Sequence, residues 1–139
     1  ELKKYIFIIC FIFLFLGSAK AQDIKEASVE VLAKTGSSWD GKELPNYPKG
    51  KPEITILRIK IPPRTKLPVH EHPVINAGVL LSGELTVYTE DNKKVHLQAG
   101  DSIVEVVDTW HYGKNEGNTT AEIIVFYSGV HGRPITIKK

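Results

Sequence analysis

Three histidines have the residue type and spacing of a metal site. His70 and His72 flank Glu71, and on an extended strand residues i and i+2 point to the same side. Their Cα atoms would lie about 6.5–7 Å apart, so both imidazoles can reach one metal ion. A His-x-His pair alone also suits a polar surface strand. His111, which lies 39 residues beyond His72, supplies the third ligand that makes a metal site the better interpretation.

The elements that must position these side chains are β-strands. After Ala21 no apolar period of 3.6 residues extends beyond two turns, whereas short β-rich runs alternate with turn residues. Glu53–Ile61 is the clearest strand, because apolar residues such as Leu57 alternate with charged residues such as Arg58. Pro62 ends it, since proline cannot donate to a sheet ladder. Further strands are expected at Ser28–Thr35, Ala77–Leu81, Glu84–Thr89, Lys94–Leu97, Ser102–Val107, Ala121–Tyr127 and Ile135–Ile137.

The spacing of these strands predicts the fold class. Many short strands at intervals of roughly 8–12 residues favour one antiparallel sandwich or barrel. The chain has 139 residues, the length of a single domain, and shows no internal repeat or low-complexity segment. We expect residues 22–139 to form one all-β domain.

The first 21 residues have the pattern of a secretory signal peptide. Lys3 and Lys4 precede the apolar run Tyr5–Leu16, and the small residues Ala19 and Ala21 suit a cleavage site. A membrane anchor is disfavoured, because twelve apolar residues fall short of the roughly 20 that span a bilayer. We expect cleavage after residue 21 and a periplasmic or secreted protein with no membrane attachment.

Charge and cysteine content exclude several functions. The first 21 residues carry a net charge of +2, while the remaining 118 carry 15 basic and 15 acidic residues. Because like charges never form a block longer than two after residue 21, we expect no nucleic-acid partner. Cys10 belongs to the leader, so the mature chain has no thiol nucleophile. We find no P-loop, dinucleotide fingerprint or Ser-His-Asp set.

The histidine spacing resembles the two motifs of the cupin superfamily, which are G-x5-H-x-H-x3-4-E-x6-G and G-x5-P-x-G-x2-H-x3-N. Every spacing holds between Arg64 and Asn115. The resemblance implies a single antiparallel jelly-roll β-barrel that forms a homodimer. It also implies that His70, His72 and His111 bind a divalent transition metal such as Fe, Zn, Mn or Ni. Six of the ten marked positions hold the family residue: His70, His72, Gly83, Gly100, His111 and Asn115.

Four positions depart from the motifs. Asn76 stands where the family has a metal-binding glutamate, and we expect a weak fourth ligand or a hydrogen-bond partner for substrate. Three histidines can still hold a metal, although they could instead hydrogen-bond a ligand without one. Arg64 and Asp108 replace glycines, and Val106 replaces a proline. Aspartate tolerates positive φ, whereas we expect an ordinary φ at Arg64.

Two further residues are candidates for substrate binding. Trp39 lies in the long loop before the main strand, either as a lid that stacks on substrate or as a plug against the barrel exterior. Glu105 precedes His111 by six residues. It shares the parity of His111 if no bulge intervenes, and is a weak candidate for an acid or base.

The resemblance leaves the activity open, because a fold does not determine a function. Family members include dioxygenases, isomerases and lyases, so a metal-dependent enzyme acting on a small molecule is the first hypothesis. The alternative is a non-enzymatic binder of a sugar or organic acid. Its best support is that the sequence offers no convincing general acid or base, so the catalytic residue is unknown. A structural protein with a vestigial pocket is the third hypothesis.

Overall fold

The computed structural model describes residues 25–139, so the predicted signal peptide of residues 1–21 lies outside the described range. Lys25–Glu30 and Val31–Lys139 belong to separate units, and the first has neither helix nor strand. The second holds all ten strands. We find no helix from residue 25 onward, and therefore none in that part that could cross a membrane.

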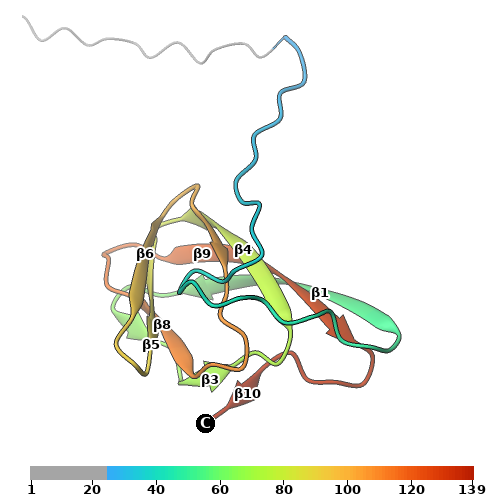
Figure 1. Ribbon diagram of the computed structural model, residues 1–139. Coiled ribbons are helices and arrows are strands. Elements are labelled where there is room, and N and C mark those ends of the chain that lie inside the picture. The colour runs from blue at the N-terminus through green and yellow to red at the C-terminus, as the bar shows by residue number, and fades with distance from the viewer. Residues whose placement is uncertain (1–24) are drawn as a thin grey trace, which may run out of the picture. The chain divides into compact units, whose positions relative to one another are not determined.

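The strands form two antiparallel sheets (Figure 1). In the first sheet the order is β1 (Pro52–Ile61), β9 (Ala121–Val130), β4 (Ile75–Ser82) and β7 (Ser102–Val104). In the second it is β10 (Ile137–Lys138), β3 (His70–Glu71), β8 (His111–Asn115), β5 (Glu84–Thr89) and β6 (Lys94–Gln98), and β2 (Thr65–Lys66) also pairs with β8.

Strands that are neighbours in space are mostly distant in sequence. All ten residues of β1 pair with β9, and β4 lies between β9 and β7. Such long connections between antiparallel strands in two sheets make a jelly roll. The predicted all-β jelly-roll fold is therefore confirmed.

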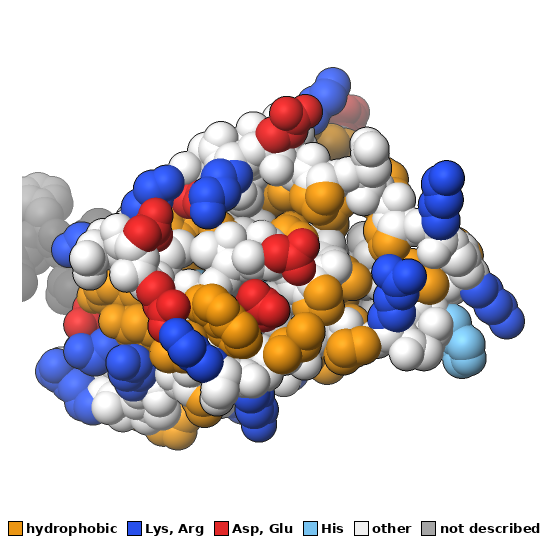
Figure 2. All heavy atoms as spheres, turned by 60° about the horizontal axis from the view of Figure 1, so that its bottom comes forward, with side chains coloured by type: hydrophobic (Ala, Val, Ile, Leu, Met, Phe, Trp, Pro, Cys, Tyr) orange, Lys and Arg blue, Asp and Glu red, His pale blue; other side chains and the backbone are white. Residues whose placement is uncertain are grey.

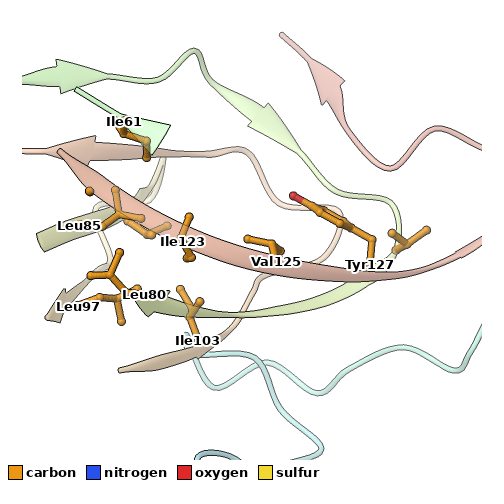
Figure 3. Packing of buried hydrophobic residues seen from close by; sticks show 11 residues of the cluster. Ile61, Leu80, Leu85, Leu97, Ile103, Ile123, Val125 and Tyr127 are labelled. Atoms are coloured by element: carbon orange, nitrogen blue, oxygen red, sulfur yellow. The ribbon is translucent and has the colours of Figure 1, made fainter. Parts of the chain in front are cut away.

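The core lies between the inner faces of the two sheets. Along β9, alternate residues are buried, and Figure 3 shows Ile123, Val125 and Tyr127 extending to the same side of the strand. Leu80 of β4 and Leu85 of β5 pack in the same cluster. Period-two burial thus produces one apolar interior between the sheets.

The surface carries charges of both signs. Figure 2 shows acidic and basic side chains interspersed around a hydrophobic area on the face that it presents. This arrangement follows from the sequence, in which like charges are not grouped.

The structure corrects the predicted strands at three places. Ser28–Thr35 is exposed and irregular, because it pairs with no other described strand. The strand expected at Ser102–Val107 ends at Val104, since the chain then turns through Asp108 with a φ of +50°. Of the strand expected at Ile135–Ile137 only Ile137 lies in β10. An extended strand was expected at His70–His72, without bounds, and β2 was not predicted.

Two motif positions that lack the family glycine have the positive φ that glycine adopts most readily. Asp108 lies in the left-handed region, as its residue type allows. Arg64 also has a positive φ, of +58°, so the expectation of an ordinary φ there was wrong. The Asp108 amide donates to the carbonyl of His72 at 2.9 Å, which ties this turn to the histidine segment.

Candidate metal centre

His70, His72 and His111 come together at one place. β3 and β8 are neighbours, and their register sets His70 directly opposite His111. One ring nitrogen from each histidine lies within 4.8 Å of those of the other two. The ring centroids are 4.4–5.0 Å apart. The predicted clustering of the three imidazoles is therefore present.

A backbone carbonyl fixes the orientation of each imidazole. Nδ1 of His70 lies 2.8 Å from the oxygen of Pro68, and Nδ1 of His111 lies 2.7 Å from that of Thr109. Nδ1 of His72 is 2.9 Å from the oxygen of Ile135. Because a carbonyl only accepts, each Nδ1 must carry the hydrogen. The lone pair of each neutral ring is then on Nε2, as a metal ligand requires.

Burial keeps these histidines neutral. It lowers the pKa of His72 to about 4, and it also lowers the pKa of His70 and of His111. In each case the hydrogen bond from Nδ1 to a carbonyl opposes the effect of burial without cancelling it. Three neutral imidazoles, each with a free Nε2, suit a divalent transition metal.

The low pKa of His72 predicts that the metal-free protein loses stability in acid. The pKa is about 4 in the folded protein and 6.5 for an unperturbed histidine, so between these values only the unfolded chain binds the proton. The free energy of unfolding should fall by about 3 kcal/mol from pH 7 to pH 4 on account of this residue. Urea denaturation of the wild type and of His72→Gln measures the difference, and identical pH profiles would contradict the prediction.

Asn76 occupies the inner face of β4 in the same cavity as the histidines. Its side chain is buried, and Nδ2 donates to the carbonyl of Val74 at 3.2 Å. No group between residues 25 and 139 donates to its Oδ1. This oxygen is thus available to a ligand, although coordination of a metal by Asn76 stays a prediction.

Glu105 also lines this cavity and is buried. Its Oε1 accepts two hydrogen bonds, from Nε1 of Trp39 at 2.7 Å and from the Val106 amide at 2.9 Å. Its Oε2 lies 3.8 Å from Nε2 of His111. Burial raises the pKa of the carboxyl group, and the two hydrogen bonds oppose that rise.

Trp39 is connected to the site by its hydrogen bond to Glu105. Its backbone amide donates to the carbonyl of Val104 at 2.9 Å, which anchors the preceding loop to β7. The side chain packs against the core, and Trp39 is not one of the described residues that line the cavity. Direct contact of Trp39 with a substrate stays a prediction.

The cavity has a volume of about 70 Å³. This is room for several water molecules or a ligand of a few non-hydrogen atoms. His70, His72 and Tyr127 also line an adjoining cavity of about 210 Å³ beside Lys138. The polar groups of the smaller cavity are Asn76, Glu105, Tyr127 and the three histidines, and aliphatic residues such as Ile59, Leu85 and Val125 form the rest.

Tyr127 is the site residue that sequence reasoning missed. Its ring lies against His72, with centroids 5.3 Å apart, and its hydroxyl bonds to no other described group. Burial raises its pKa to about 12, so the hydroxyl stays protonated and can donate to a ligand. The sequence did hold a sign of it, because Tyr127 alternates with the same period as Ile123 and Val125 and so faces the interior with them. Of these three side chains, only that of Tyr127 ends in a polar group.

Comparison with protein families gives one match. The model of the cupin domain matches residues 57–127, slightly more than half of the chain. No curated protein matches the chain.

Solved structures share the fold at low sequence identity. DMSP lyase DddQ from Ruegeria pomeroyi has a TM-score of 0.54 and 17% identity, over 62% of this chain and 43% of that one. Oxalate decarboxylase from Lactobacillus farciminis, in complex with formate, has a TM-score of 0.53 and 20% identity, over 61% and 26%. Oxalate decarboxylase from Bacillus subtilis, which has Mn(II) centres, has a TM-score of 0.52 and 21% identity, over 61% and 23%. The chain therefore spans less than half the length of these proteins.

Proposed function

Because this chain belongs to the cupin domain family, we propose that it is a metal-dependent enzyme acting on a small molecule. His70, His72 and His111 hold the divalent transition metal. The observation that carries the proposal is the convergence of three neutral imidazoles, each with Nδ1 bonded to a carbonyl, inside a cavity. Fe, Zn, Mn and Ni all suit such ligands.

The chain's own residues then bind and orient the substrate. A divalent metal held by the three histidines would supply a Lewis acid to a substrate bound in the cavity. Tyr127, whose ring lies against His72, donates a hydrogen bond from its hydroxyl to the bound molecule. The aliphatic side chains that line the rest of the cavity lower the local dielectric constant, which strengthens polar contacts there.

Lyase or isomerase chemistry fits these groups best. Among the described residues that line the cavity there is no thiol, and the one hydroxyl is that of Tyr127, which stays protonated and serves proton transfer. Structures of the same fold include a DMSP lyase and oxalate decarboxylases, which supports the proposal. Dioxygenase chemistry is the second candidate, because three nitrogen ligands leave vacant positions for oxygen.

Turnover assays separate these activities. The mature protein is loaded with Mn²⁺, Fe²⁺, Zn²⁺ or Ni²⁺ and mixed with small carboxylates, carbonyl compounds and aromatic diols, followed by NMR and by an oxygen electrode. We expect substrate loss without oxygen uptake, and no loss with His111→Ala. Oxygen uptake would favour the dioxygenase. Ligand binding without turnover across the panel would favour a non-enzymatic binder of sugars or organic acids.

We propose further that the protein is exported and acts in the periplasm or outside the cell. The support is the basic and apolar pattern of residues 1–21. Expression of the full chain in a bacterial host with intact secretion, followed by N-terminal mass analysis, tests this. A mature chain that begins at Gln22 is expected, and a full-length chain confined to the cytoplasmic fraction would contradict export.

The mature protein should be a homodimer. β1 and β9 expose large apolar side chains on the outer face of the first sheet, with Ile54 62%, Ile56 57% and Phe126 47% exposed. Ile56 pairs with Phe126 across the two strands, so these side chains are neighbours. Light scattering should give twice the mass of the mature chain, and Phe126→Glu should reduce it to one. A monomeric wild type would refute the prediction.

A further inference from the structure

Glu105 lies directly across from Asn76, the position where the family motif has its metal-binding glutamate. The register of β4 and β7 pairs Ala77 with Val104, and one residue further the Glu105 amide donates to the carbonyl of Asn76 at 3.0 Å. Side chains that oppose each other in this way project from the same face with Cβ atoms about 4.5–5.5 Å apart. Both side chains line the cavity that holds the histidines.

The two oxygens of Glu105 have different surroundings. Oε1 is saturated by the Trp39 indole and the Val106 amide. Oε2 receives no hydrogen bond from the described residues and lies 3.8 Å from Nε2 of His111. The Trp39 and Val106 donors therefore hold the carboxyl group so that its free oxygen faces the histidines.

The carboxyl group is also buried without a cation. No lysine or arginine within residues 25–139 forms an ion pair with Glu105. A carboxylate removed from water without a partner is costly, so such groups are usually paired or coordinate a metal. A divalent ion at the three histidines would supply the missing positive charge.

We propose that Glu105 is the carboxylate ligand of the metal, contributed by the strand that neighbours the position of Asn76. The inference rests on the proposed metal site. Ligand bonds of about 2.0–2.2 Å place neighbouring ligand atoms roughly 3.0–3.5 Å apart, so a small rotation of the Glu105 side chain brings Oε2 into range. Trp39 is then a positioning residue, because its indole fixes the other oxygen.

The test is the metal affinity of Glu105→Gln, measured by competition with a chromophoric chelator for Mn²⁺ and Zn²⁺. Glutamine keeps the size of the side chain and can still accept from Trp39, but its oxygen is neutral. We expect the affinity to fall more than about 100-fold, beyond the 10–100-fold that changes outside the ligand set cause. The exposed Glu43 gives the matched control, and Glu43→Gln should bind like the wild type.

Relocation of the carboxylate gives the second measurement. In the Glu105→Gln background, Asn76→Glu should restore the affinity to within about 10-fold of the wild type. The substitution places a carboxylate at the site again, now on the opposing strand. The visible spectrum of the Co²⁺-loaded protein should change with Glu105→Gln, since the number of ligands changes. If Glu105→Gln does not fold, Trp39→Phe carries the test and should lower the affinity about 10-fold.

The outcomes separate this inference from the proposed function. A wild type that binds no metal would refute both. If the wild type binds metal and Glu105→Gln binds it within about 3-fold with an unchanged Co²⁺ spectrum, Glu105 is not a ligand and only the histidine site stands.

Discussion

The His111→Ala variant is expected to bind Mn²⁺ and Zn²⁺ more than about 1,000-fold more weakly than the wild type, beyond the 10–100-fold that changes outside the ligand set cause. His111 is the member of the cluster that β8 contributes, and it is buried and lies opposite His70 in the register. Its loss leaves two imidazoles from one short segment of chain. Chelator competition measures the affinity.

His96 provides the matched control. It is a histidine of the same all-β unit on the exposed side of β6, where its Nδ1 bonds to Thr86. His96→Ala should keep the wild-type affinity. If His111→Ala binds metal as tightly as His96→Ala does, the three-histidine centre is wrong.

The Asn115→Ala variant is expected to lose about 3 kcal/mol or more of the free energy of unfolding, because a fully buried amide and its four hydrogen bonds are removed at once. Asn115 is fully buried at the end of β8. Its Nδ2 donates to the carbonyls of Ile61, Pro62 and Thr119 at 3.0, 3.1 and 2.8 Å, and its Oδ1 accepts from the Gly117 amide at 3.0 Å. One side chain thus joins the end of β1 to the loop before β9.

Urea denaturation of Asn115→Ala beside Asn118→Ala measures this effect. Asn118 is in the same loop, but its one side-chain contact is with Arg64 at the surface, so its removal should change stability by less than about 0.5 kcal/mol. A loss of under 1 kcal/mol for Asn115→Ala, on the order of one ordinary hydrogen bond, would show that the loop is held in another way. The family motif has an asparagine at this position, but the sequence alone did not show which backbone groups its side chain binds.

Long alternating strands could be predicted from the sequence, whereas short ones could not. The ten residues of β1 alternate clearly between inward and outward positions, and Glu53–Ile61 was predicted almost to its ends. β3 has two residues, too few for any period to show. The strand predicted at Ser28–Thr35 was wrong although its residues favour β structure. Residues such as Val29 do not make a strand where no partner strand pairs with them.

The side chains of the candidate metal centre were visible in the sequence, while the contacts that orient them were not. The His-x-His spacing indicated that His70 and His72 face the interior together, and Glu105 has the same strand parity as His111. All four side chains line one cavity. The bond from Trp39 to Glu105 spans 66 residues and depends on how the loop packs against β7. The carbonyl of Ile135 that orients His72 comes from the irregular segment before β10. No local pattern encodes either contact.

The metal content of the wild-type mature protein tests the central claim most directly. Elemental analysis after purification from metal-replete medium should find about one equivalent of a divalent transition metal per chain, as a site with three histidine ligands requires. A content below about a tenth of an equivalent, with no uptake when the metal-free protein is titrated with Mn²⁺, Fe²⁺, Zn²⁺ or Ni²⁺, would contradict it.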